Sequence, residues 1–384
     1  MNEVTQLKKI SVEKALGMTL AHDITEIVPG KKKDVAFSRG KIIEKGDIER
    51  LLDLGKRYLY VFEGPAKGVH EDDASTRIAQ AILGEYMEYT SPKEGKVTIK
   101  TTENGLFYVN AQHLFAINKI KNVLLSTLPN RHLVKKGDII AATRIIPLYI
   151  DEKSLKRVEK IGEGRVISVS PFKSLNIGLV ITGSEVYTGR VQDGSSLVEN
   201  KLRNYGLTVA GKIIVPDEIS MIKDAILSLF NSGVDLVLTT AGLSVDPDDV
   251  TKEGIEATGA ETLFYGTPVF PGAMFLVARF RGKYILGAPA CVYYNRNTVL
   301  DIILTRLLAG ERMHKNDMVK LWILGVVFFV FYPIVTFCDA LISTRAKRAT
   351  ISVKNPRIPN NLGTWPNHQR HPPLLQRADF VLTA

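Results

Sequence analysis

Two short segments, each directly after an apolar run, hold residue types suited to binding an anion. The first is Thr182-Gly183-Ser184-Glu185, which follows the apolar run 177–181. A tight glycine turn exposes backbone N–H groups beside two hydroxyls, and such a turn accommodates phosphate-like oxygens. A glycine turn at the end of a strand also has a purely structural explanation, so this segment alone does not assign a ligand.

The second segment, residues 239–251, begins with hydroxyl groups and ends in acids. Asp246, Asp248 and Asp249 place three carboxylates within four positions. Like charges at this spacing repel one another, so a fold tolerates them when a cation joins them or water solvates them. The segment therefore suits a phosphorylated ligand with Mg²⁺. The alternative is that Asp248 and Asp249 lie in the first turns of a helix, where the macrodipole favours acids.

Other chemistry-bearing residues point to structure instead. His70 stands beside three acids at 71–73, an arrangement typical of a solvated helix start rather than a metal site. Cys291 has no histidine placed to activate it, so we interpret it as a small core residue. Neither Gly-x-x-x-x-Gly-Lys nor Gly-x-Gly-x-x-Gly occurs in the chain, which excludes the usual nucleotide and dinucleotide loops.

The elements around the two segments alternate between strand and helix. Apolar runs predict strands at 177–181, 212–215, 234–238 and 284–286, and periodic apolar positions predict helices at 197–205, from Asp217 onward, and at 298–308. Buried parallel strands are nearly all apolar, so we predict a doubly wound, mainly parallel α/β domain over 171–312. Both segments would then lie at the carboxyl ends of strands, where such sheets bind ligands.

The 384 residues exceed one ordinary domain, and two further regions precede the α/β domain. Residues 1–92 read as a mixed α/β region, with a helix capped by Asp47, a strand at 58–62 and a helix from Asp72 to about Tyr86. Residues 93–170 alternate apolar and polar positions and predict a small β-rich subdomain. Helix-like spacing at 118–125 indicates that this subdomain is not purely β.

The net charge of +10 is concentrated near the end of the chain. Residues 345–384 hold seven bases and one acid, so +6 of the +10 lies there, and they contain five prolines. The rest of the chain has no basic stripe, and this argues against nucleic-acid recognition. We expect 345–384 to be disordered because this composition cannot bury a core.

Several motifs, in one order, resemble the molybdopterin-binding proteins of molybdenum cofactor biosynthesis that are related to molybdopterin molybdenumtransferase. They are Thr-Gly-Ser-Glu-Val from 182, Thr-Thr-Ala-Gly-Leu-Ser-Val-Asp-Pro-Asp-Asp-Val-Thr from 239, Gly-Thr-Pro-Val-Phe-Pro-Gly from 266 and Gly-Ala-Pro-Ala-Cys from 287. Shorter matches at 15–18, 28–30, 36–40 and 143–147 extend the resemblance over about residues 8–320.

The resemblance implies that molybdopterin or adenylylated molybdopterin binds on these loops, with Mg²⁺ and molybdate, and that AMP is exchanged for molybdenum. It implies catalytic roles for Asp246, Asp248 and Asp249, of which Asp248 and Asp249 would also bind metal. The positions that it implies for the cofactor are Thr182, Gly183, Ser184, Glu185, Thr240, Ala241, Gly242, Ser244, Pro271, Gly272 and Pro289. We also expect a cytoplasmic homo-oligomer.

This sequence departs from the family pattern at several positions. Ser184 replaces a common Asp, Ala241 occupies a usual Gly position, and the Gly-Asn-Pro typical near Pro289 is Pro-Ala-Cys here. We expect this protein to lack the C-terminal β domain of the transferases. These departures favour ligand binding over turnover, so a non-catalytic molybdopterin carrier or sensor is the alternative function.

Residues 321–338 form an uncharged run of 18 residues, long enough to span a bilayer. A membrane anchor is one interpretation. The charges that flank the run would place the rest of the chain on the side of the membrane opposite the cytosol, where the cofactor pathway operates. Because the resemblance stops abruptly at Leu321, the other interpretation is a shifted reading frame. We expect residues 321–384 to lie outside the functional fold.

Overall fold

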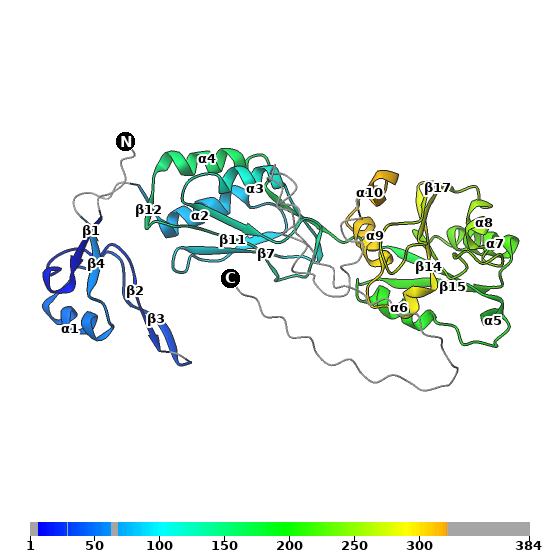
Figure 1. Ribbon diagram of the computed structural model, residues 1–384, viewed down its shortest axis with the longest axis horizontal. Coiled ribbons are helices and arrows are strands. Elements are labelled where there is room, and N and C mark those ends of the chain that lie inside the picture. Colours follow the sequence, from blue (N-terminus) through cyan, green and yellow to red (C-terminus); the bar gives the residue numbers. More distant parts are fainter. Residues whose placement is uncertain (1–6, 29, 63–67, 320, 322–384) are drawn as a thin grey trace, which may run out of the picture. The chain divides into compact units, whose positions relative to one another are not determined.

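The computed structural model describes residues 7–28, 30–62, 68–319 and 321. The candidate membrane span at 321–338, apart from Leu321, and the tail at 345–384 lie outside these residues. Within the described part of the chain, no helix combines the length and the apolar character needed to cross a membrane. Figure 1 labels the elements that follow.

The first core lies within residues 12–61. Its strands pair antiparallel, β1 (Leu7–Ser11) with β4 (Tyr58–Phe62) and β2 (Ile24–Val28) with β3 (Lys32–Phe37). The short helix η1 (Val12–Lys14) and α1 (Lys45–Asp53) complete the region. Glu44 and Asp47 cap α1 reciprocally, since each side chain accepts the other's backbone N–H. Leu20, Leu51 and Leu59 are buried between these elements.

The second core lies within residues 74–169. A four-stranded antiparallel sheet has the order β6-β7-β11-β9, a three-stranded one has the order β10-β8-β13, and β5 pairs with β12. The elements are β5 (Val69–His70), α2 (Glu71–Ile82), β6 (Met87–Tyr89), β7 (Lys96–Thr101), β8 (Gly105–Val109), α3 (Ala111–Asn118), β9 (Val123–Thr127), β10 (His132–Val134), β11 (Ile139–Ile145), β12 (Tyr149–Ile150), α4 (Glu152–Gly162) and β13 (Ile167–Pro171). Ile78 of α2 is buried in the same core as Ile99 and Val158.

Two expectations for this part of the chain differ from the structure. The predicted division at residue 92 falls inside one core, because α2 packs with residues 97–169 rather than with the first region. The helix predicted at 118–125 is wrong: α3 ends at Asn118, and Val123–Thr127 forms β9 with alternating burial. Ile120, Val123 and Leu124 recur at helical spacing, whereas Val123 and Leu125 alternate as in a strand. Pairing with β11 selects the strand.

The third region is an α/β domain built on one six-stranded sheet of order β15-β14-β16-β19-β18-β17. Strands β14, β15, β16 and β19 are parallel, and β18 runs antiparallel to its two neighbours. The elements are β14 (Asn176–Thr182), α5 (Ser184–Tyr187), α6 (Ser195–Arg203), β15 (Thr208–Val215), α7 (Ile219–Asn231), β16 (Leu236–Thr240), α8 (Thr251–Glu256), β17 (Glu261–Tyr265), β18 (Leu276–Phe280), β19 (Lys283–Ala288), η2 (Ala290–Tyr293), α9 (Val299–Leu308) and α10 (Lys315–Val319). The predicted fold class is confirmed.

Both faces of this sheet are covered, which explains its apolar strands. Leu179 of β14 packs with Leu202 of α6 and with α9 on one face. Val180, its neighbour, packs with Ile226 of α7 and with α8 on the other face. The fold thereby brings the carboxyl ends of β14, β15, β16 and β19 to one edge, where the two predicted ligand loops emerge.

Candidate functional site

The loop after β14 is tied to the end of β15 by a carboxylate. Gly183 has φ +142°, a conformation that side chains rarely adopt, and its N–H donates to the Val215 carbonyl at 3.2 Å. The Ser184 N–H and hydroxyl both donate to the Asp217 carboxylate, at 2.8 and 3.1 Å. Ser184 and Glu185 are exposed in α5. Asp217 therefore belongs to this loop.

The helix expected from Asp217 onward begins two residues later, at Ile219, so Asp217 is neither its first residue nor its cap. Glu218 occupies the N-cap position of α7, and it makes no capping hydrogen bond through its side chain. Parallel pairing of Thr182 with Val215 brings Asp217 next to Ser184, 33 residues away in the chain. A carboxylate thus lies beside Ser184, the position at which the family commonly has Asp.

Buried hydroxyl groups join the loop after β14 to the loop after β16. Thr182 is 2% exposed, and its Oγ1 donates to the Thr240 carbonyl at 2.9 Å and lies 3.0 Å from Thr251 Oγ1. The Tyr293 hydroxyl donates to Thr240 Oγ1 at 2.6 Å. We call Thr182, Thr240, Thr251 and Tyr293 the hydroxyl latch. The latch connects the ends of β14 and β16 with the start of α8 and with η2, which follows β19.

The loop after β16 has two consecutive residues in the left-handed conformation. Ala241 has φ +69° and Gly242 has φ +60°. A Cβ atom at position 242 would come within 2.2 Å of Thr251 Oγ1, so only glycine fits there. Thr251 N–H donates to the Gly242 carbonyl at 3.1 Å, which fixes the loop against the start of α8. Ala241 carries strain that the glycine usual in the family would avoid.

The three acids predicted as catalytic lie in this loop before α8 begins, with Asp246 and Asp248 exposed and Asp249 half-buried. Asp249 accepts the Ser244 N–H at 2.9 Å, and Asp246 accepts the Asp248 N–H at 3.3 Å. The first-turn acid of α8 is Glu253, so Asp248 and Asp249 precede the helix rather than lying in its first turn. Within the described ranges, no three His, Cys, Asp or Glu side chains form a group that could hold a metal ion.

The remaining predicted positions line the same edge of the sheet. Pro271 accepts the Val299 N–H at 3.3 Å through its carbonyl, and a Cβ at Gly272 would come 2.9 Å from Val299 Cγ2. Pro289 directly precedes η2. Burial raises the pKa of the Cys291 thiol, which agrees with a structural rather than a nucleophilic role. These turns hold the start of α9 and the segment that carries Tyr293.

A buried ion pair that sequence reasoning missed holds the segment after β19. Lys201 of α6 is 8% exposed, and its Nζ donates to the Asp301 carboxylate at 2.8 Å and to the Arg296 carbonyl at 2.6 Å. Asp301 also accepts from the Tyr205 hydroxyl and the Thr298 N–H. The sequence offers no periodic signal for this pairing, because the charges are 100 residues apart.

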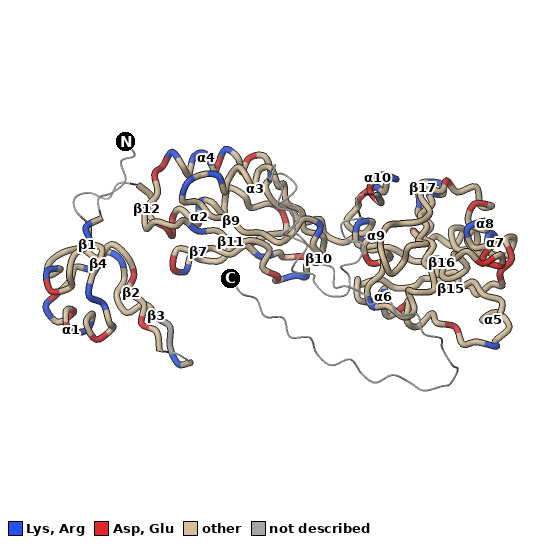
Figure 2. Tube along the Cα trace, in the orientation of Figure 1, with Lys and Arg blue, Asp and Glu red and all other residues tan. Residues whose placement is uncertain are grey.

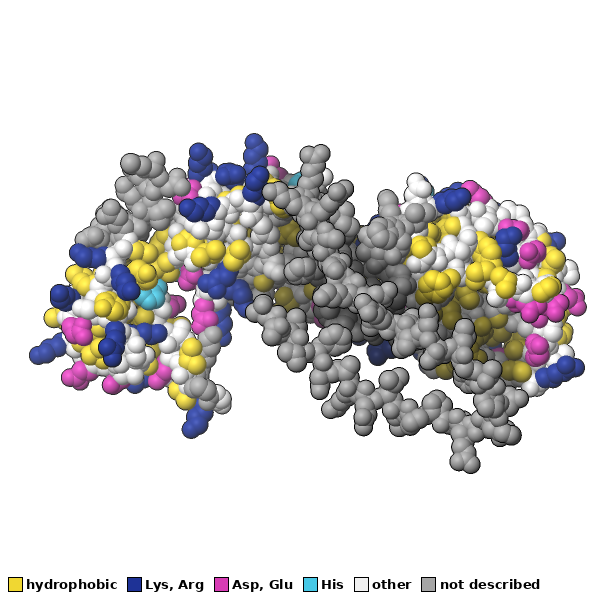
Figure 3. All heavy atoms as spheres, in the orientation of Figure 1, with side chains coloured by type: hydrophobic (Ala, Val, Ile, Leu, Met, Phe, Trp, Pro, Cys, Tyr) yellow, Lys and Arg dark blue, Asp and Glu magenta, His cyan; other side chains and the backbone are white. Residues whose placement is uncertain are grey.

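The surface around the loops is acidic and partly hollowed. Figure 2 shows acidic residues gathered beside α7 and α8, and Figure 3 shows acidic and apolar side chains together at that end of the domain. A shallow hollow of about 620 Å³ is lined by residues that include Asp217, Ser220, Lys223 and Val250. A second hollow of about 320 Å³ lies along β15 and α6, away from both loops. The first hollow therefore adjoins the candidate site.

Comparisons with known proteins bear on two regions. Residues 178–310 match a family model described as a probable molybdopterin binding domain, and residues 9–63 match a domain of unknown function. A CinA-like protein of Mycobacterium avium is 38% identical over 81 residues, 21% of this chain and 19% of that protein. A CinA-like protein of Mycobacterium sp. (strain MCS) is 38% identical over 111 residues, 29% of this chain and 26% of that protein. The match spans about a fifth to a quarter of these relatives' length.

Solved structures similar to this chain include CinA of Thermoplasma acidophilum, with 20% identity, a TM-score of 0.31, and coverage of 35% of this chain and 98% of that one. The molybdopterin biosynthesis enzyme MoaB of Thermus thermophilus has 19% identity, a TM-score of 0.28, and coverage of 36% and 98%. The family model spans the sheet from β14 to α9 and includes both latched loops. Residues 178–310 of this chain are thus similar, through the family model, to a probable molybdopterin binding domain.

Proposed function

We propose that the two latched loops bind molybdopterin and that the chain acts in molybdate insertion during molybdenum cofactor biosynthesis. The domain family supports molybdopterin as the ligand and a role in the pathway. The observation that carries the proposal is the hydroxyl latch, which holds both loops at the carboxyl edge of a doubly wound sheet. Gly183, Ser184, Glu185, Gly242 and Ser244 would face the ligand from these loops.

Thr182 and Thr240 stabilise the two loops and do not contact the ligand. Their hydroxyls are buried and already bonded within the latch, so neither offers an oxygen to a ligand outside. The exposed residues of the loops include Ser184, Glu185 and Ser244. We therefore assign the ligand's anionic group to the backbone amides at 184–185 and 242–244 and to the hydroxyls of Ser184 and Ser244.

Two of these amides are occupied by the protein's own carboxylates. Asp217 accepts the Ser184 N–H, and Asp249 accepts the Ser244 N–H. A phosphate oxygen that took either amide would have to displace the carboxylate, and it would meet a like charge beside it. Binding would therefore include a rearrangement of Asp217, Asp249 or both.

The assignment of Mg²⁺ to Asp248 and Asp249 stays a prediction. The described residues do not gather three carboxylates into a metal-binding group, and the Asp249 carboxylate already accepts a backbone amide. We derive no reaction step through Mg²⁺. The metal role predicts that Asp248→Asn or Asp249→Asn reduces Mg²⁺-dependent activity while leaving the fold intact. Unchanged Mg²⁺ dependence in both variants would exclude these two residues from metal binding.

The alternative is a non-catalytic molybdopterin carrier or sensor. The acidic surroundings of the loops favour it, because Asp217 and Asp249 lie where an incoming molybdate oxyanion would be repelled. Release of AMP from adenylylated molybdopterin in the presence of molybdate and Mg²⁺ distinguishes the two functions. AMP release above background supports insertion, whereas binding without release supports a carrier.

Calorimetry with molybdopterin tests the binding site itself. Ser184→Ala should weaken binding by about 1–3 kcal/mol if the hydroxyl serves a charged oxygen. Ser228→Ala is the matched control, because Ser228 is exposed on α7 and outside both loops. Equal affinities for both variants and the natural chain would exclude Ser184 from the site.

A further inference from the structure

The exposed large apolar side chains of the α/β domain lie at one edge of its sheet. Every one recorded among the described residues of this domain follows the carboxyl end of a strand or begins a helix there. They are Tyr187, Val191, Leu197, Ile219, Val245, Phe270 and Tyr294. The same edge carries the two ligand loops, so the domain exposes its apolar surface around the candidate site.

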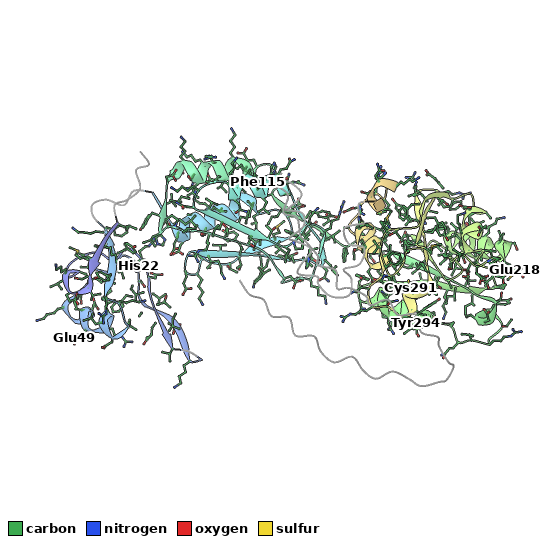
Figure 4. All side chains as sticks on the ribbon, viewed as in Figure 1. His22, Glu49, Phe115, Glu218, Cys291 and Tyr294 are labelled. Carbon is green, nitrogen blue, oxygen red and sulfur yellow. The ribbon has the colours of Figure 1, made fainter. Side chains whose placement is uncertain are left out.

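Tyr294 is the aromatic residue of this set with the most exposed ring. Its side chain is 85% exposed, and its ring meets the Tyr293 ring edge to face, with centroids 6.5 Å apart. Tyr293 in turn donates to Thr240 Oγ1 of the hydroxyl latch. The exposed ring is therefore coupled to the loop after β16 through one neighbouring residue. Figure 4 labels Tyr294 together with Cys291 of the same segment.

The segment that carries Tyr294 is fixed at several points. A Cβ at Gly194 would come 2.7 Å from Tyr293 Cδ1, so that ring packs directly on the backbone before α6. Asn295 Nδ2 donates to the Cys291 carbonyl at 3.0 Å, and Lys201 Nζ holds the Arg296 carbonyl. The segment thus presents the Tyr294 ring from a defined backbone position.

We propose that Tyr294 is a stacking wall for the planar pyrimidine ring of a bound pterin, while the loops at 183–185 and 242–244 hold its phosphate. The proposal rests on the proposed function and adds a residue that recognises the ring. A planar heteroaromatic ring stacks on a tyrosine face, and the favourable contact removes apolar area of both partners from water. An anion alone would gain nothing from this wall, so Tyr294 separates ring recognition from phosphate recognition.

The test uses the full chain and two probes, a fluorescent pterin monophosphate and glycerol phosphate, which lacks the ring. Tyr294→Ala should weaken binding of the pterin probe roughly five- to 150-fold, the range expected for loss of one aromatic stacking contact. It should also abolish quenching of the pterin fluorescence. Binding of glycerol phosphate should not change. Tyr294→Phe keeps the ring and should bind both probes like the natural chain.

Phe115→Ala is the matched control, because Phe115 is another exposed aromatic residue, on α3 in the second core region. Unchanged pterin affinity in Tyr294→Ala, with binding in the natural chain intact, would overturn the stacking wall and leave the proposed function standing. Equal weakening of both probes would also overturn it, since Tyr294 would then act on the phosphate loops. Failure of the natural chain to bind the pterin probe would overturn the proposed function together with the wall.

Discussion

Replacing Thr182 with Val should loosen the α/β domain through loss of the hydroxyl latch. Valine keeps the volume of the side chain and its preference for a strand, so packing in the sheet is nearly unchanged. The hydroxyl is lost, and with it the 2.9 Å bond to the Thr240 carbonyl and the 3.0 Å contact with Thr251 Oγ1. The change therefore isolates the polar contribution of the latch.

The magnitude follows from what the substitution leaves behind. Removing one partner of a buried hydrogen bond costs about 1–3 kcal/mol, because the other polar group is left without its partner. Thr251 is buried and would lose the contact with Thr182. We expect the free energy of unfolding of the domain to fall by about 2–3 kcal/mol in Thr182→Val.

Native-state hydrogen exchange measures this change within one domain of a multidomain chain. The most protected amides of β14 and β16 should exchange about 30- to 150-fold faster, because 1.4 kcal/mol corresponds to a factor of about ten. Thr182→Ser keeps the hydroxyl and should lose far less protection. Thr208→Val, at an exposed position of β15, serves as the control. Protection in Thr182→Val equal to that of the Thr208 control would refute the latch.

Four further changes test other parts of the structure. Ala241→Gly should raise the free energy of unfolding by about 1 kcal/mol, measured in urea, because it relieves a left-handed alanine. Lys201→Met should lower it by about 3 kcal/mol by leaving Asp301 buried without its cation, and Asp301→Leu in the same chain should restore part of the loss. Asp217→Asn should tighten binding of a pterin monophosphate, seen by calorimetry, because a negative charge beside the Ser184 amide is removed; weaker binding would instead assign Asp217 to the ligand. Burial lowers the pKa of His22, His70 and His132 below 6.5. Below about that pH the unfolded chain therefore binds protons that the folded chain does not, and the urea concentration at the midpoint of unfolding should fall as the pH drops. A midpoint that does not change with pH would contradict this.

The α/β domain could be predicted from the sequence because its strands are buried on both faces. The runs that begin near Ile177 and end near Leu238 contain little but apolar residues, and each ends at a hydroxyl-rich loop. The carboxyl-edge location of both loops followed from parallel pairing alone. In the second core, short half-buried strands such as Val123–Thr127 fit two periods, and only their partners decide between them.

The contacts that shape the site could not be predicted because they join positions far apart in the chain. The pairing of Ser184 with Asp217 depends on the register between β14 and β15, and that of Tyr293 with Thr240 depends on the path of η2. Asp217 also suited a helix cap, which is a local role that the sequence could describe. In the structure Glu218 is the N-cap of α7, and the register between β14 and β15 places the Ser184 amide 2.8 Å from the Asp217 carboxylate.

In the same contacts, buried hydroxyls stabilise the loops, whereas exposed hydroxyls remain accessible to a ligand. Thr182 and Thr251 are buried and face each other, so they can only hold the loops together. Ser184 is exposed, and its N–H and hydroxyl donate to the half-buried Asp217 carboxylate, a side-chain partner that a ligand oxygen could replace. A substitution in the latch should therefore change stability first and binding second, whereas a substitution at Ser184 or Asp217 should change binding with little effect on stability. Measuring both quantities on the same variants separates the support of the site from its recognition surface.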